Sequence, residues 1–153
     1  DLYGVMDTNG KIILEPEDDT IGVDLNDFEQ NGIENKYILL DKLIPVEKDN
    51  LWGFFNLKGE KVTDLKYTEL GCKTSKVPNS YPLLVIPSRD IIVVEKDNMY
   101  NLMKANGKEL INGYLLEDVY LKANTETGES TFYMTYGGKT EDIEKKLDSL
   151  GIE

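Results

Sequence analysis

Residues 49–62, DNLWGFFNLKGEKV, decide the fold because their pattern occurs three times in the chain. Residues 2–13 read LYGVMDTNGKII, and residues 97–110 read DNMYNLMKANGKEL. The aromatic positions of the three copies are Tyr3, Trp52 and Tyr100, which are 49 and 48 residues apart. A nearly constant period of this length is typical of a repeat architecture, in which one supersecondary unit packs on the next.

Each copy has the pattern of an antiparallel β-meander. Residues 48–50 predict a turn, because Asp and Asn tolerate a left-handed backbone, and the aromatic-rich residues 51–56 predict a strand. Lys58-Gly59 predicts a second turn, which Asn-Gly forms at 9–10 and 106–107, where a type I′ hairpin is expected. Strands are also expected at residues 37–40, 44–46, 60–63, 83–86, 91–95 and 130–136, up to four in each repeat.

The predicted fold is all-β, with about three tandem antiparallel β-meander repeats and a short C-terminal α-helix. We expect one domain over residues 1–153, with repeats at 1–43, 44–90 and 91–138 and the helix at about 140–150. Thr140 is the expected N-cap, Gly151 the expected stop, and Ile143, Leu147 and Leu150 form one apolar stripe. This helix is expected to cover one end of the repeats.

The sequences of the two chain ends are compatible with either an open array of repeats or a closed one. Asp1 aligns with Asn50, so the first copy lacks the strand that precedes the turn in the other copies. Either the chain is a piece of a longer repeat protein, or Ser130 to Tyr136 supplies that strand and closes a propeller-like ring.

The aromatic residue and its successor form the structural motif of the repeat. The successors are Gly4, Gly53 and Asn101, and because Asn tolerates positive φ best after Gly, we expect a left-handed backbone at this position. The aromatic side chains are expected to pack in the core or between repeats, the alternative being an exposed row that stacks on a sugar or a peptide. The motif residues are Tyr3, Gly4, Gly10, Trp52, Gly53, Gly59, Tyr100, Asn101 and Gly107.

These residues resemble the WG-repeat family of bacterial proteins. The resemblance lies in residues 49–53 (DNLWG), in Lys58-Gly59 and in residues 66–71 (KYTELG), and it covers about three repeats. In the flanking copies Tyr replaces Trp, and in the third copy Asn replaces Gly. The resemblance implies a tandem β-rich module, often exported or attached to larger proteins, with no common activity and no functional residues to carry over.

The net charge of the chain limits the kinds of ligand that it is expected to bind. The chain has 17 basic and 29 acidic residues, a net charge of −12, and eight of the acids lie in residues 12–35, which contain no Lys or Arg. This charge removes the main source of affinity for nucleic acid, so we expect none to bind. A basic partner, a cation or solubility alone would each account for it. The longest apolar stretch, residues 81–94, is interrupted by Pro and charged residues, so no membrane span is expected.

The inventory of catalytic and ligand-binding residues is small. The chain has no His, and its single Cys72 is expected to be a small buried apolar residue. Residues 27–32 (DFEQNG) match the first half of a calcium loop that starts at Asp27, but its twelfth position is Ile38, so a solvated acidic loop is preferred. We expect no catalytic residue, metal or cofactor.

Two functions follow from these observations. The first is a non-enzymatic repeat scaffold that mediates protein or cell-surface interactions, either by itself or as one part of a longer array. The alternative is a carbohydrate-binding or carbohydrate-active domain that uses exposed aromatics and acids such as Asp18, Asp19 or Glu117. An exported or cell-surface location is slightly favoured by the family resemblance.

Overall fold

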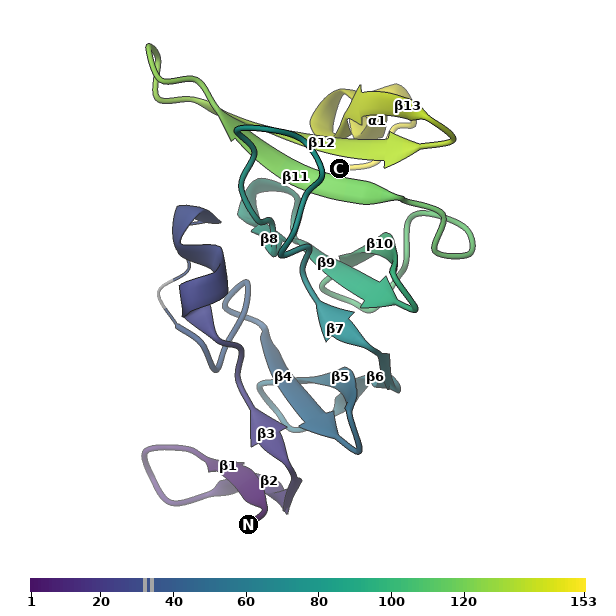
Figure 1. Ribbon diagram of the computed structural model, residues 1–153. Coiled ribbons are helices and arrows are strands. Elements are labelled where there is room, and N and C mark those ends of the chain that lie inside the picture. Colours follow the sequence, from purple (N-terminus) through teal and green to yellow (C-terminus); the bar gives the residue numbers. More distant parts are fainter. Residues whose placement is uncertain (32, 34) are drawn as a thin grey trace.

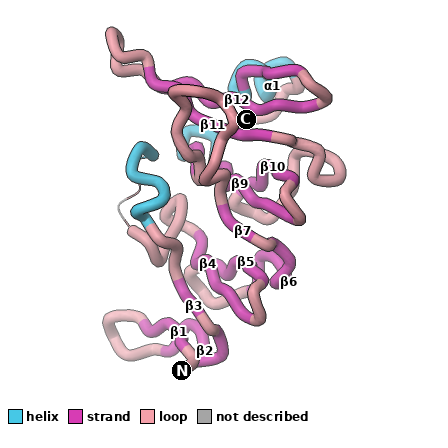
Figure 2. The backbone as a smooth tube through the Cα atoms, in the orientation of Figure 1, coloured by secondary structure: helices cyan, strands magenta, loops and turns pink. Residues whose placement is uncertain are grey.

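The computed structural model describes residues 1–31, 33 and 35–153. The chain runs from one end of an elongated β array to the other (Figure 1). The all-β prediction is confirmed, since strands dominate and α1 (Ile143–Ser149) is a short C-terminal helix (Figure 2). Two 3₁₀ segments are η1 (Leu25–Asn31) and η2 (Pro87–Arg89). The strands are β1 (Tyr3–Met6), β2 (Ile12–Asp18), β3 (Thr20–Ile21), β4 (Leu43–Lys48), β5 (Leu51–Asn56), β6 (Lys61–Tyr67), β7 (Glu69–Leu70), β8 (Val85–Ile86), β9 (Ile91–Lys96), β10 (Met99–Lys104), β11 (Asp118–Ala123), β12 (Ser130–Tyr136) and β13 (Lys139–Asp142).

Successive units are joined by strands that pass from one sheet into the next. The sheets have the strand orders β1-β2, β3-β4-β5-β6, β10-β9-β7 with β8 also on β9, and β11-β12-β13, and all pairs are antiparallel. After β2 the chain bends into β3, where Thr20 pairs with Glu47 of the next hairpin. After β6 it bends into β7, where Glu69 pairs with Glu95 in the same way. Backbone hydrogen bonds therefore connect each unit to its successor.

The array is open. Of the two alternatives, the closure of a ring by Ser130–Tyr136 is wrong, because β12 pairs with β11 and β13 at the opposite end of the array from β1 (Figure 1). In this position Asp118 pairs with Thr135, as Glu69 pairs with Glu95 one unit earlier. Pairing with the strand just before it in the chain costs less loop entropy than pairing with a strand more than a hundred residues away.

The two kinds of turn differ from each other in backbone conformation. Asp49-Asn50 and Asp97-Asn98 have positive φ at both residues, as type I′ hairpins require. The expected type I′ turn at Asn-Gly is wrong, since at residues 9–10 and 106–107 only the glycine has positive φ. The Gly10 and Gly107 amides instead donate to carbonyls three residues earlier, which describes a type I turn followed by a left-handed glycine.

The C-terminal helix begins later than expected. Thr140 is not its N-cap, because the Gly137-Gly138 turn first returns residues 139–142 as β13. The N-cap is Asp142, whose carboxylate accepts from the amide of Lys145 at 3.1 Å. Of the apolar stripe, Ile143 and Leu147 are buried, whereas Leu150 is 56% exposed. Gly151 has positive φ and ends the helix as expected.

Residues 37–40 do not form the expected strand. Leu39 makes only an isolated bridge to Leu43, because Leu40 and Asp41 take positive φ and turn the chain at once into β4. The central hairpin is therefore preceded by an irregular segment that contains η1.

The core lies between units as well as within them. One cluster surrounds Phe54 and Tyr67, a second surrounds Leu102 and Val119, and a small third cluster holds Leu14 against β4. Because each cluster contains residues from adjacent units, burial adds to the hydrogen bonds that join them.

Candidate functional site

The aromatic motif residue and the glycine after it, which we call the aromatic-glycine step, have the same backbone pairing in the first two units. Tyr3 pairs with Asp18 and Val5 with Leu14; 49 residues later, Trp52 pairs with Tyr67 and Phe54 with Thr63. Between these partners the returning strand has two extra residues, which form a bulge. In the third unit Tyr100 bridges to Leu116, at nearly the same separation.

Close approach of the backbone, rather than a left-handed conformation, requires glycine at this step. The expectation of positive φ is wrong, because neither glycine nor Asn101 is among the described residues with positive φ. A Cβ atom added to Gly53 would lie 2.7 Å from the carbonyl oxygen of Asp64, and one added to Gly4 would meet the carbonyl oxygen of Leu14. The bulged strand therefore passes too near for any side chain that points this way.

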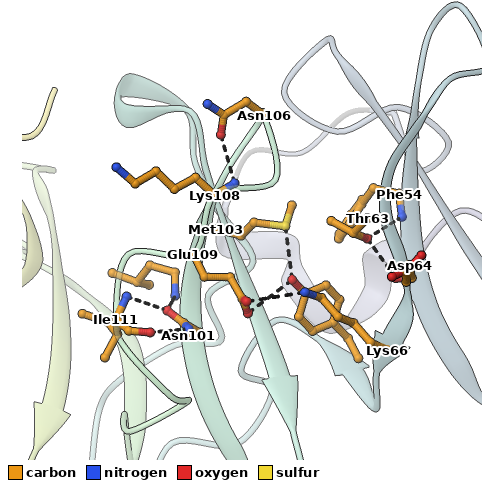
Figure 3. Close-up of polar contacts among 12 residues, drawn as sticks. Phe54, Thr63, Asp64, Lys66, Asn101, Met103, Asn106, Lys108, Glu109 and Ile111 are labelled. Atoms are coloured by element: carbon orange, nitrogen blue, oxygen red, sulfur yellow. Dashed lines mark hydrogen bonds and ion pairs between the residues drawn. The ribbon is translucent and has the colours of Figure 1, made fainter.

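Asn101 replaces the close approach with hydrogen bonds in the third unit (Figure 3). Its side-chain nitrogen donates to the carbonyl of Ile111 at 2.6 Å, and its oxygen accepts from the amides of Ile111 and Leu102 at 2.9 and 2.8 Å. In the central unit the corresponding amide, that of Phe54, donates to the hydroxyl of Thr63 at 3.2 Å. Both arrangements satisfy a buried amide at the bulge, so the step is a structural tie.

The three motif aromatics differ in burial. Trp52 and Tyr100 are half-buried and pack on the first and second core clusters. Tyr3 is 54% exposed, because no strand of the described chain covers its outer side.

Tyr67 connects the second and third units. Its hydroxyl lies 3.4 Å from a carboxylate oxygen of Glu109 and 3.5 Å from the sulfur of Met103, and the same carboxylate forms an ion pair with Lys66 at 3.5 Å. Burial, and then the Glu109 charge, raise the pKa of Tyr67, so the phenol stays protonated and donates. This cluster is a contact between units.

The turn glycines lie against the preceding unit. Gly59 approaches the carbonyl of Ile13, and Gly107 approaches the carbonyl of Val62, so that a Cβ added to Gly107 would lie 3.0 Å from that oxygen. Ile13 and Val62 are themselves 49 residues apart. The contact is therefore repeated along the array.

The acids named for a hydrolytic site are not brought together. Asp19 and Glu117 occupy corresponding positions two units apart, since Asp19 directly precedes β3 and Glu117 directly precedes β11. Figure 1 shows β3 near one end of the array and β11 near the other. The carboxylate of Asp19 accepts from the amide of Asp49 at 2.9 Å. Asp18 is only 7% exposed, and burial, then the neighbouring Glu17, raise its pKa.

The acidic residues and the cysteine of the described part of the chain are not arranged for metal binding or thiol chemistry. Within it, no group of three or more His, Cys, Asp or Glu could hold a metal ion. The half calcium loop at 27–32 includes Gly32, which lies outside the described residues, and Asp27 is 3.6 Å from the Lys73 ammonium. Cys72 is fully buried, which raises the pKa of its thiol, and its sulfur lies 3.6 Å from a carboxylate oxygen of Asp118.

Exposed apolar side chains gather at the N-terminal end of the array. Leu2, Tyr3, Met6, Ile12 and Tyr37 are each about half exposed or more, and they are five of the nine large apolar residues that are exposed in the described chain. We call these five residues the N-terminal apolar surface. A cavity of about 810 Å³ lies among β1, β3 and residues 35–38 and is lined by Tyr3, Met6 and Tyr37.

Sequence reasoning missed this surface. Met6 corresponds to Phe55 of the central unit, and Tyr37 lies within a predicted strand, and neither was among the expected motif residues. The only signal was the absence of a strand before the first copy.

No helix in the described part of the chain is long and apolar enough to cross a membrane. No curated protein and no solved structure matches the chain at a significant level. The family model of the WG containing repeat matches residues 3–22 and 52–72, which are the first two aromatic-glycine steps with their returning strands. These two segments are similar to the WG containing repeat that the Trp-Gly motif at residues 52–53 indicates.

Proposed function

We propose that this protein is a non-enzymatic repeat scaffold that binds a protein partner through the N-terminal apolar surface. The observation that carries the proposal is that three of these exposed apolar side chains, Tyr3, Met6 and Tyr37, line one cavity in the first unit of the array. Single exposed apolar residues are ordinary, but a cluster of them marks an interaction site. Tyr3, Met6 and Tyr37 are also of residue types that are enriched in protein interfaces.

The placement of the reactive groups supports a role without catalysis. Asp19 and Glu117 belong to units that are not adjacent in the array, and Cys72 is fully buried. The charge of −12 likewise favours a protein partner over nucleic acid.

A carbohydrate ligand is the second candidate, because Tyr3, Tyr37 and Asp19 all line the same cavity. An exposed aromatic face beside a carboxylate is an arrangement that could stack on a sugar ring and bind its hydroxyls.

The test is a peptide-display selection on the wild-type protein, followed by measurement of dissociation constants for the selected peptides. A Tyr3→Ser/Met6→Ser double variant removes two exposed side chains of the surface, and Leu57→Ser removes an exposed side chain of the second unit as the matched control. Full burial of such a side chain contributes about 1.5–3 kcal/mol, so the double variant should bind at least about tenfold more weakly, and the control should not change.

The proposal fails if no selected peptide distinguishes the wild-type protein from the double variant. It also fails if an oligosaccharide array yields ligands that displace the peptides and depend on Tyr3, Tyr37 and Asp19, which would establish the second candidate.

A further inference from the structure

We propose that Asn112 deamidates spontaneously in the folded protein, so that the third unit carries an asparagine that converts to aspartate and isoaspartate. This covalent modification is independent of the proposed function. Asparagine is among the thermolabile residues, and the Asn-Gly sequences of this chain are at residues 9–10, 31–32, 106–107 and 112–113. The pair at 31–32 includes Gly32, which lies outside the described residues. Of the three pairs that the structure describes, it leaves one open to reaction.

Deamidation joins the side chain of an asparagine to the backbone nitrogen of the next residue. That nitrogen loses its proton and attacks the side-chain carbonyl carbon, so a C–N bond forms, the bond to the side-chain nitrogen breaks, and ammonia leaves with the proton. Water then opens the resulting succinimide ring at one carbonyl or the other, which gives aspartate or isoaspartate. Glycine favours the attack because it has no side chain beside the attacking nitrogen and because its backbone turns freely. An amide that donates a hydrogen bond is held in place and keeps its proton, so such a bond protects the asparagine before it.

The Asn-Gly turns of the repeats are protected in this way. The amide of Gly10 donates to the carbonyl of Asp7 at 3.1 Å, and the amide of Gly107 donates to the carbonyl of Lys104 at 2.8 Å. The side-chain oxygen of Asn106 also accepts from the backbone amide two residues later at 2.9 Å, which holds the side chain in one orientation. Both asparagines of these turns are therefore expected to react slowly in the folded protein.

The Asn112-Gly113 pair lies where the third unit departs from the repeat. Tyr100 bridges to Leu116, a separation one residue longer than that of the corresponding pair in either of the other units. The pair is therefore not held by the turn geometry that the units share.

Within this segment the attacking amide is free. The segment is anchored before the pair, where the amide and the carbonyl of Ile111 are both hydrogen-bonded to the side chain of Asn101, and after the pair, where Leu116 is fully buried. Asn112 and Gly113 between these anchors are exposed. Among the described residues, neither the Gly113 amide nor the Asn112 side chain has a hydrogen-bond partner, and a Cβ added to Gly113 would meet no atom within 4 Å. The side chain can therefore turn toward the amide without losing a contact.

The conversion adds a charge at a defined place on the molecule. Asn112 lines a cavity of about 400 Å³ together with Lys139, Glu141 and Lys146. A carboxylate at residue 112 would lie in this cavity with both lysines, and it adds one negative charge to a chain whose net charge is already −12. Because the pair is exposed and lies between strands, the reaction does not require the fold to open.

The experiment compares the rates of the asparagines in the folded and the unfolded protein. The wild-type chain is incubated in mildly alkaline buffer, with and without guanidinium chloride, and digested with a protease at successive times. Mass spectrometry follows the fraction of each Asn-Gly peptide that has gained about 1 Da. Electron-transfer fragmentation then distinguishes isoaspartate from aspartate.

In the folded protein we expect Asn112 to deamidate at least tenfold faster than Asn9 and Asn106 and to yield both isomers. In guanidinium chloride the three rates should agree within about threefold, because unfolding removes the hydrogen bonds of the Gly10 and Gly107 amides. An Asn112→Gln variant should lose the mass gain at this position, since the longer side chain would have to close a larger ring. Asn106→Gln is the matched control and should leave the reaction at Asn112 unchanged.

Three results would overturn the inference. Equal rates at Asn112 and Asn106 in the folded protein would show that the hydrogen-bonded glycine amide gives no protection. Reaction at Asn112 only in guanidinium chloride would show that the folded segment holds the pair out of reactive geometry. Aspartate without isoaspartate would show direct hydrolysis by water in place of attack by the Gly113 amide.

Discussion

Replacement of Gly59 by alanine tests whether the turn glycines hold neighbouring units together. Gly59 has a φ of +84°, and an added Cβ would meet the backbone carbonyl oxygen of Ile13 in the preceding unit. Alanine in a left-handed conformation costs about 1 kcal/mol or somewhat more. A backbone oxygen cannot move away as the end of a flexible side chain can, so overpacking adds about 1–3 kcal/mol. We expect Gly59→Ala to lower the free energy of unfolding by about 2–4 kcal/mol.

Alanine substitutions at two other glycines separate the cost of a left-handed backbone from the cost of the contact between units. Gly10 occupies the same turn of the first unit with a φ of +85°, and Gly113 lies later in the chain with a φ of +82°; an added Cβ would meet no atom within 4 Å at either position. Gly10→Ala and Gly113→Ala should each cost only the conformational term of about 1 kcal/mol. Gly107→Ala should lie between these values and that of Gly59→Ala, because its Cβ would lie 3.0 Å from the carbonyl oxygen of Val62.

The assay is urea unfolding followed by circular dichroism, with free energies obtained by linear extrapolation. The order of cost should be Gly59 first, Gly107 second, and Gly10 and Gly113 last. If Gly113→Ala proves as costly as Gly59→Ala, then left-handed backbone alone explains both glycines, and the argument that they form contacts between units is refuted.

Three further predictions concern polar groups. Asn101→Ala leaves buried backbone groups at the bulge without partners, so it should cost about 2–4 kcal/mol in urea unfolding, and a loss below about 0.5 kcal/mol would contradict the role of this side chain. The raised pKa of Asp18 means that the native state binds this proton more tightly than the unfolded chain, so this group lowers stability as pH rises above about 4. Asp18→Asn should therefore gain stability relative to wild type between about pH 3 and pH 7, and a constant difference would count against the burial effect. Arg89 donates to Glu144 and Asp148 of α1, so Arg89→Ala should speed amide exchange in α1 more than Lys146→Ala does; equal rates would show that the helix is held by apolar packing alone.

The first unit differs from the other two in how the edge of its aromatic-glycine strand is covered. In the second and third units the edge of the aromatic-glycine strand is covered by the hairpin partner that precedes it, and the core continues across the contact. The first unit has the same strand and the same step, yet Tyr3 and Met6 remain exposed. Repeat proteins bury each unit against its neighbours, so an exposed apolar face such as that of Tyr3 and Met6 offers buried area to whatever covers it.

The sequence alone determined the period and the all-β class. The spacing of Tyr3, Trp52 and Tyr100 was enough, because a unit repeated in sequence is repeated in backbone geometry, down to the two-residue bulge that the first two units share. The Asp-Asn turns were also predicted correctly, since their conformation depends on local preferences of the residues themselves.

Only the tertiary structure decided why Gly4 and Gly53 are glycines, which kind of turn Asn-Gly forms, and which strand β12 pairs with. Two of these depend on another strand: the carbonyl of Asp64 determines the residue at 53, and the adjacent β11 determines the partner of β12. The exposure of the N-terminal apolar surface was also decided only by the tertiary structure. Periodicity predicts which side chains point inward, but whether another strand of the chain covers them is decided only when the units are assembled in space.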